Sequence, residues 1–172
     1  MHPIKVSLGW SRGTTFVSRM IRRIDGGYFN HVYWRFDFSD GGSLIYESHL
    51  SGGVQITPYE HLLSAKVKGT VSDVFELDMK MTADQVQTLW NACLPFHHEA
   101  YDIKRIVGYY FFIRVAKRVG HKFLKIQNNN KMTCNEFVVA SGQAAEIPAF
   151  QKLDFSYTIE PLFKYFCGTP AR

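Results

Sequence analysis

Residues 131–139 read Lys131-Met132-Thr133-Cys134-Asn135-Glu136-Phe137-Val138-Val139. Thr133 and Glu136 have the spacing of a capping box, in which a hydroxyl and a carboxylate three residues apart bond the first backbone N–H groups of a helix. This predicts a helix that begins at Cys134 and runs to about Ala145, because Pro148 forbids much more. The positive end of the helix favours a thiolate at Cys134, although its position alone fits a small buried structural cysteine better.

The composition predicts one globular domain. Of the 172 residues, 46% are hydrophobic and 15% aromatic, enough for one sizeable core, so we expect a single domain over residues 1–172. The N-terminal residues Met1-His2-Pro3-Ile4-Lys5 lack the basic-then-apolar run of a signal peptide, and no apolar stretch reaches the roughly 18 to 20 residues of a membrane span. We therefore expect a soluble protein, cytoplasmic by default, although export by another route stays open.

The cysteines favour free thiols. Cys93, Cys134 and Cys167 are far apart and form no CxxC pair, which argues against a disulfide framework or a zinc ribbon. Residues 97–102 hold two histidines and two acids, but not at a recognised metal-binding spacing, so solvent exposure is the simpler interpretation. We expect neither a metal nor another cofactor.

The formal charge of +5 is concentrated in residues 103–125, which contain seven basic residues and no acidic one around an apolar core at 106–113. Such a segment suits an anionic membrane surface, but a core helix with a solvated basic face is the simpler interpretation. No nucleic-acid-binding motif accompanies the charge, so we expect no nucleic-acid partner.

Strand-like and helix-like stretches alternate along the chain, which predicts an α+β fold. First we expect a short strand at 4–8, a turn or loop at 9–13, and a helix capped at Thr14 or Thr15 and stopped by Gly26-Gly27. Later we expect a strand at 54–56, a short helix opened by a capping box at Thr57–Glu60, and one or two strands within 66–78. A helix capped by Thr82 follows, with Cys93 on its buried stripe. The last element is expected to be a strand or helical turn within 155–166.

Between these segments, a hairpin joins strands 31–38 and 43–49 through the turn Ser39-Asp40-Gly41-Gly42. His31 opens the first strand and Glu47 lies in the second. An odd-membered loop or a bulge places the two side chains on one face of the sheet, whereas a two- or four-residue loop does not. The sequence leaves this choice open.

A cysteine at a helix start, a histidine at a strand start and a carboxylate in the next strand are the parts of a thiol hydrolase. Four segments, in chain order, resemble those of the YiiX-like branch of the NlpC superfamily, a circularly permuted group of papain-like cysteine hydrolases. They are Phe29-Asn30-His31-Val32-Tyr33, Ile45-Tyr46-Glu47-Ser48, Tyr101-Asp102 and Thr133-Cys134-Asn135-Glu136-Phe137-Val138.

The resemblance implies a permuted papain-like α+β fold, with an antiparallel sheet packed against helices and the nucleophile at a helix N-terminus. It implies Cys134 as nucleophile, His31 as base and Glu47 as the residue that orients His31. Tyr101 and Asp102 are then expected at the substrate. His49, on the same strand face as Glu47, is the alternative third residue, because several relatives have histidine there.

The resemblance also implies a peptide or acyl substrate. The first expectation is cleavage of an amide or peptide bond, such as one in a cell-wall peptide, through an acyl-thioenzyme. Lipid acyl transfer or deacylation, with residues 103–125 facing the membrane, and a catalytically inactive binding module are the alternatives. Asn30 and Asn135 replace the more common serine, the turn between His31 and Glu47 is longer, and residues 103–125 look like an insertion, which leaves the substrate open.

Overall fold

The computed structural model describes residues 2–102, 131–153 and 158–168; the basic segment 103–125 lies outside them. An antiparallel sheet of five strands, in the order β4-β3-β2-β1-β5, forms the centre of the fold. The strands are β1 (Pro3–Gly13), β2 (His31–Phe38), β3 (Ser43–His49), β4 (Gly53–Pro58) and β5 (Val71–Asp78).

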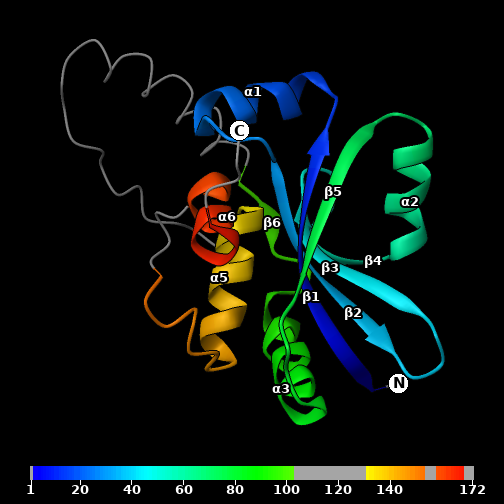
Figure 1. Cartoon of the computed structure of the whole chain (residues 1–172), viewed down its shortest axis with the longest axis vertical. Coiled ribbons are helices and arrows are strands. Elements are labelled where there is room, and N and C mark those ends of the chain that lie inside the picture. The colour runs from blue at the N-terminus through cyan, green and yellow to red at the C-terminus, as the bar shows by residue number, and fades with distance from the viewer. Residues whose placement is uncertain (1, 103–130, 154–157, 169–172) are drawn as a thin grey trace.

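Helices cover both faces of this sheet, which confirms the predicted α+β class with an antiparallel sheet packed against helices. Figure 1 shows α5 and α6 on one side of the sheet, α2 on the other, and α1 across one end. The helices are α1 (Phe16–Asp25), α2 (Tyr59–Val67), α3 (Ala83–Cys93), α5 (Cys134–Ala144) and α6 (Ile159–Cys167), with a short 3-10 turn at Leu94–Phe96. The two-residue strands β6 (Ala100–Tyr101) and β7 (Lys131–Met132) pair in parallel.

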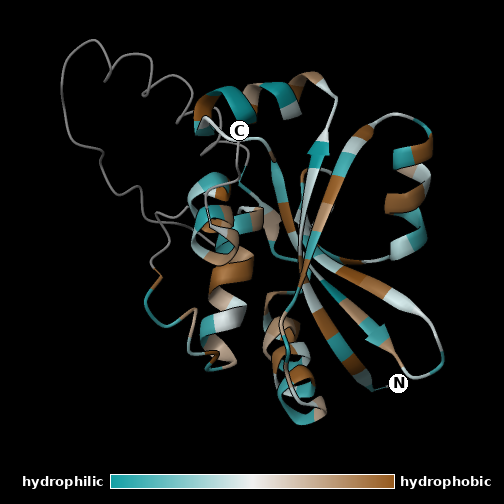
Figure 2. Cartoon of the chain, in the orientation of Figure 1, coloured by the Kyte–Doolittle hydropathy of each residue, from teal (hydrophilic) through white to brown (hydrophobic). Residues whose placement is uncertain are grey.

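The core lies between the sheet and the layer formed by α3, α5 and α6. Alternate side chains of the central strands point into it, among them Leu8 and Trp10 of β1 and Trp34 of β2, all fully buried. The same alternation is visible as brown and teal bands along the strands in Figure 2. The indole N–H of Trp34 donates to Ser141 Oγ at 2.9 Å, which joins the sheet to α5.

Three predicted helix starts are confirmed. Thr15 caps α1 by accepting from the Ser18 N–H, and α1 ends at Gly26 in the left-handed conformation (φ 72°). Thr82 and Gln85 form the capping box of α3, and Thr133 caps α5. Cys93 is completely buried on α3, as its stripe position predicted.

The prediction of a short strand followed by a turn or loop at 9–13 is wrong, because β1 continues to Gly13. Its second half pairs with both β2 and β5, which holds it extended. Gly9 looked like a turn residue, but its role is packing: a Cβ there would collide with the ring of Tyr33. A glycine that makes room for a neighbouring side chain leaves no local sign in the sequence.

The capping box predicted at Thr57–Glu60 is also wrong. β4 extends through Pro58, which is the N-cap of α2 and makes no side-chain capping bond. The hydroxyl of Thr57 donates instead to Glu47 Oε1 at 3.2 Å. Because α2 runs on to Val67, the segment 66–78 contains a helix end and one strand, β5.

The last segment, 155–166, was predicted as a strand or helical turn; its described part forms α6. Asp25 at the end of α1 accepts from the backbone N–H of Glu160 at 2.7 Å and from the hydroxyl of Thr158, so α1 and α6 are tied together. Among the residues that the structure describes, no helix has both the length and the apolarity to cross a membrane.

Candidate active site

The turn between β2 and β3 decides the face on which Glu47 lies. Asp37 pairs with Ser43, and the N–H of Phe38 donates to the carbonyl of Gly42 at 2.9 Å. The loop proper therefore has three residues and ends with Gly41 at φ 86°, the left-handed position that such loops require. An odd-membered loop places His31 and Glu47 on the same face of the sheet.

His31 and Glu47 form a close pair. Nε2 of His31 lies 2.6 Å from Oε2 of Glu47, and the two side chains are only 15% and 13% exposed. The other carboxylate oxygen, Oε1, accepts from Thr57 at 3.2 Å and lies 3.5 Å from the amide of Gln55. Thr57 and Gln55 of β4 thus hold the Glu47 carboxylate through its second oxygen. Because Nε2 of His31 is bonded to Glu47, Nδ1 is the ring nitrogen that can bond the thiol of Cys134.

The pair stabilises its charged form. Burial by itself lowers the pKa of His31, but hydrogen bonds with Cys134 and Glu47 outweigh it and raise that pKa to about 10. Burial likewise raises the pKa of Glu47, but the hydrogen bond from His31 and its charge outweigh this and lower that pKa to about 2. Near neutral pH the imidazole is therefore an imidazolium and can act as a proton donor.

Cys134 is the first residue of α5, where its position is fixed from three sides. Glu136 accepts from the Thr133 N–H at 3.0 Å, which closes the helix start. Just before it, β7 pairs with β6, and the carbonyl of Met132 accepts from the buried hydroxyl of Ser48 at 2.7 Å. Ser48 follows Glu47 directly in β3, so one strand positions both the carboxylate and the start of the helix that begins at Cys134.

Tyr101 of β6 also contacts Cys134. Burial, together with the charge and hydrogen bond of Cys134, raises the pKa of Tyr101 well above its usual value, so its hydroxyl keeps its proton. Asp102 adds a negative charge beside Tyr101 that acts in the same direction. The structure therefore brings together Cys134, His31, Glu47 and Tyr101, with Asp102 next to Tyr101.

His49, the predicted alternative to Glu47, has a different place. Its ring meets the His31 ring edge-on, with centroids 6.1 Å apart, and its Nδ1 lies 2.9 Å from Ser51 Oγ. Burial, followed by the positive charge of His31, lowers the pKa of His49. The hydrogen bond that fixes the His31 ring is thus made to Glu47, and His49 lies beside the pair as a neutral neighbour.

A pocket of about 600 Å³ opens beside this cluster, on the side of the sheet that carries α2. His31, Glu47 and Tyr101 form part of its lining. Cys134 is only 2% exposed, and it is covered on this side by the His31 and Tyr101 side chains that contact it.

Sequence reasoning missed the supporting residues Ser48, Gln55 and Thr57. Once the hairpin register is known, Gln55 lies directly opposite Glu47 in the β3–β4 ladder, and Thr57 follows two residues later on the same face. The alternation of side chains in β4 was the signal that could have found both. Ser48 is different, because its contact with Met132 depends on how distant segments fold together.

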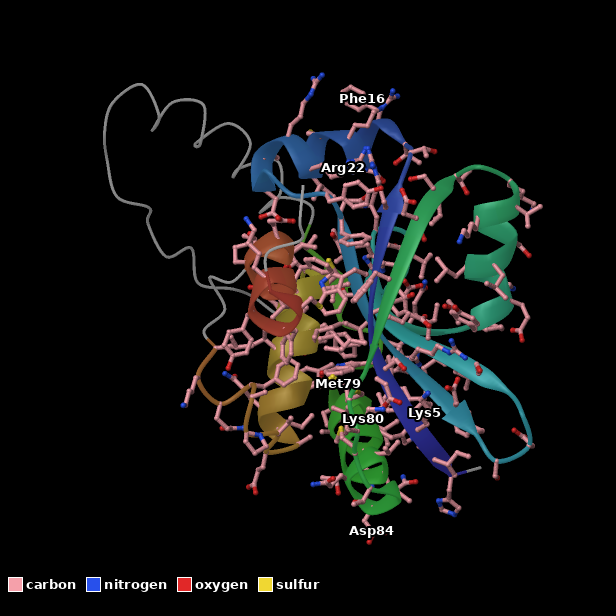
Figure 3. All side chains as sticks on the ribbon, in the orientation of Figure 1. Lys5, Phe16, Arg22, Met79, Lys80 and Asp84 are labelled. Carbon is pink, nitrogen blue, oxygen red and sulfur yellow. The ribbon has the colours of Figure 1, made fainter. Side chains whose placement is uncertain are left out.

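Asn30, one of the residues unlike those in the family pattern, has a structural role. Its buried side-chain oxygen accepts from the Gly13 N–H at 2.7 Å and from Arg22 Nη1 at 3.0 Å. Arg22 points inward from α1, whereas Phe16 points outward, as Figure 3 shows. Asn30 therefore fixes α1 against the strand end that carries His31.

No family model and no curated protein matches the sequence. Among solved structures, the fold is similar to the crystal structure of the metalloprotein yiiX from Escherichia coli O157:H7, DUF1105, with a TM-score of 0.59 and 14% sequence identity. The match covers 84% of this chain and 67% of that one. The fold is YiiX-like. At this identity the likeness concerns the fold alone.

That neighbour is named a metalloprotein, and a metal site requires several His, Cys, Asp or Glu side chains close together. Across residues 2–102, 131–153 and 158–168, no three His, Cys, Asp or Glu side chains are grouped so that they could hold a metal ion. In the cluster itself, Nε2 of His31 is occupied by Glu47. We therefore assign no metal ligands to these residues.

Proposed function

We propose that this chain is a cysteine hydrolase with a circularly permuted papain-like, NlpC-type domain, and that it cleaves an amide or peptide bond. The observation that carries the proposal is the position of His31 between Cys134 and Glu47. Its Nε2 is bonded to the carboxylate at 2.6 Å and its ring also contacts the thiol. Nucleophile, base and orienting group are the three parts that covalent acyl transfer requires.

The reaction has two steps. The sulfur of Cys134 attacks the carbonyl carbon, and the imidazolium of His31 donates its proton to the departing nitrogen as the C–N bond breaks, which leaves an acyl-thioenzyme. His31, now neutral, takes a proton from water as the water oxygen attacks the thioester. The C–S bond then breaks, and the carboxylic acid leaves while the thiolate and imidazolium are restored.

Glu47 acts through His31 in both steps. Its carboxylate fixes the ring and stabilises the imidazolium, while Gln55 and Thr57 keep the carboxylate in place. The backbone N–H of Cys134 and the protonated hydroxyl of Tyr101 are the proposed donors to the oxyanion that forms on the carbonyl oxygen. Tyr101 and Asp102 are accordingly proposed at the substrate.

The experiment is turnover of amide and thioester substrates by wild type and by Cys134→Ala and His31→Ala variants. Both variants are expected to lose at least about a thousandfold in kcat/KM, and wild type is expected to form a mass adduct that maps to Cys134. Cys167→Ala and the exposed His2→Ala, neither of which lines the pocket beside His31, are the controls and should retain activity. Turnover by the Cys134→Ala protein would refute the proposal.

A membrane-surface role for residues 103–125, the absence of nucleic-acid binding and the cytoplasmic location stay predictions from the sequence. The proposed partner of the described site is a peptide or acyl substrate.

A further inference from the structure

The start of α1 and the end of α2 meet at one corner of the molecule. The N–H of Thr14, just before α1, donates to the carbonyl of Thr70 at 2.9 Å, and its hydroxyl donates to the carbonyl of Gly69 at 2.9 Å, just after α2. Both helices are described along their whole length, and neither has a buried residue. The two helices therefore present most of their side chains at the surface.

This corner carries two apolar side chains that are almost completely exposed. Among the described residues, Phe16 and Val67 are the most exposed large apolar side chains, at 75% and 89%. Phe16 opens α1 and points away from the molecule in Figure 3, and Val67 ends α2. Apolar side chains that protrude in this way favour a partner that offers an apolar phase.

Exposed cations surround these apolar side chains. They are Arg19 and Arg23 on α1, and Lys66 and Lys68 at the end of α2. None of them makes a salt bridge within the described residues. The acids of the two helices, Asp25 at the end of α1 and Glu60 in the first turn of α2, lie at the helix ends away from the corner. A positive surface without internal partners fits an anionic partner.

We propose that this surface, the α1–α2 corner, docks on an anionic phospholipid bilayer. The corner is formed by the outward residues Phe16, Arg19, Arg23, Lys66, Val67 and Lys68. Its cations bind lipid phosphates while Phe16 and Val67 enter the layer between headgroups and acyl chains, the combination that holds basic amphipathic helices on such membranes. A soluble polyanion would also bind the cations, but it offers no apolar phase to Val67, whose aliphatic side chain does not stack as an aromatic ring does.

The α1–α2 corner is separate from the candidate active site. The same two helices face the pocket with other residues, among them Ile21 of α1 and Leu62 of α2, whereas no corner residue lines it. Substitutions at the corner therefore leave the pocket and the His31–Glu47 pair in place. Docking does not depend on whether the chain hydrolyses an amide bond, so binding alone tests it.

Phe16→Trp tests insertion directly. Full-length protein is mixed with vesicles of phosphatidylglycerol and phosphatidylcholine, and the emission of wild type, which has three tryptophans, is subtracted. The emission of the new indole should shift to the blue and be quenched by lipids brominated on their acyl chains. Ile4→Trp, at an exposed position at the opposite end of β1, is the control and should show neither effect. An indole at position 16 that stays in water while the protein binds vesicles would overturn the proposal.

The contribution of the cations is tested by sedimentation with the same vesicles. Arg19→Gln with Arg23→Gln should weaken binding roughly fivefold for each charge removed, because a cation near an anionic surface contributes about that factor. Lys80→Gln with Lys152→Gln removes the same charge at exposed positions outside the corner and should weaken binding much less. Equal losses in the two double variants would overturn the assignment of binding to the corner.

The contribution of the apolar side chains separates a bilayer from a soluble polyanion. Phe16→Ser with Val67→Ser keeps every charge and should weaken vesicle binding at least about tenfold. Ile4→Ser with Leu94→Ser, at exposed apolar positions elsewhere, is the matched control and should bind as wild type does. No vesicle binding by wild type would overturn the proposal. Heparin binding as tight as vesicle binding, and unchanged by Phe16→Ser with Val67→Ser, would overturn it in favour of a polyanion site.

Discussion

The carboxylate of Glu47 is held by side chains from two strands, His31 on β2 and Thr57 on β4, with Gln55 at the edge of hydrogen-bond distance. Each contact favours the ionised carboxylate, and the ionised carboxylate in turn favours the protonated imidazole. The two charges therefore depend on each other. This dependence makes the pair measurable through the pH dependence of stability.

At this scale we predict that Glu47→Gln lowers the free energy of unfolding by about 2 kcal/mol, mainly in a limited pH range. The pKa of His31 is raised from 6.5 to about 10, so its contribution is complete below pH 6.5 and is lost as the pH rises through 10. The pKa of Glu47 is lowered from 4.5 to about 2, so its contribution is complete above pH 4.5 and is lost as the pH falls through 2.

The difference in unfolding free energy between wild type and Glu47→Gln should thus be largest between pH 4.5 and 6.5. It should become smaller at lower and at higher pH. Urea unfolding at about pH 3, 5.5 and 9.5 measures it. Glu60→Gln, at an exposed position in the first turn of α2, is the control and should change little at any pH. A difference that stays constant across this range would contradict the charged pair.

At the scale of elements, β4 and β6 meet through Gly53. The N–H of Val54 donates to the carbonyl of Glu99, and that of His98 donates to the carbonyl of Val54, so the chain that leads to Tyr101 lies directly on β4. A Cβ at Gly53 would collide with the Glu99 carbonyl, and the φ of Gly53 is 68°. The position of Tyr101 therefore depends on the missing side chain at Gly53.

Gly53→Ala should cost about 3 kcal/mol of unfolding free energy, the sum of left-handed backbone strain and displacement of Glu99. Gly41→Ala is the matched control: its φ is 86°, but a Cβ would meet nothing within 4 Å, so it should cost only about 1 kcal/mol. Chemical denaturation of both variants measures the costs. Equal losses would mean that the close approach of β6 to β4 contributes nothing.

Helix starts were predictable because capping is local. The residues that cap α1, α3 and α5 lie within three positions of the N–H groups or carbonyls they serve, so spacing alone identified them. The strand at residues 9–13 and the role of Thr57 depend on partners distant in sequence, Tyr33 and Glu47 respectively. Local pattern carries no information about such partners.

At the scale of the described molecule, the sheet and α5 pack together around one buried hydrogen bond, from the Trp34 indole N–H to Ser141 Oγ. This packing also holds the helix that begins at Cys134 against the strand that begins at His31. Short motifs in the sequence were enough to identify Cys134, His31 and Glu47 as candidates. Whether these side chains come together depends on the three-residue turn and on this packing, which a short motif does not encode.

Ser141→Ala should leave the buried indole N–H of Trp34 without its acceptor and lower the unfolding free energy by about 2 kcal/mol, or the melting temperature by roughly 5 °C. The exposed Ser64→Ala on α2 is the control and should leave the melting temperature nearly unchanged. Differential scanning calorimetry provides the measurement. Equal melting temperatures for wild type and Ser141→Ala would show that this hydrogen bond does not stabilise the packing of α5 against the sheet.

The central claim is that His31 activates Cys134. Its most direct test is the rate of alkylation by iodoacetamide at about pH 6, measured by peptide mass mapping, with the half-buried Cys167 as internal reference. Cys134 should react at least about tenfold faster than Cys167 in wild type, and His31→Ala should remove this advantage. A Cys134 that reacts no faster than Cys167, or at the same rate with and without His31, would contradict the account.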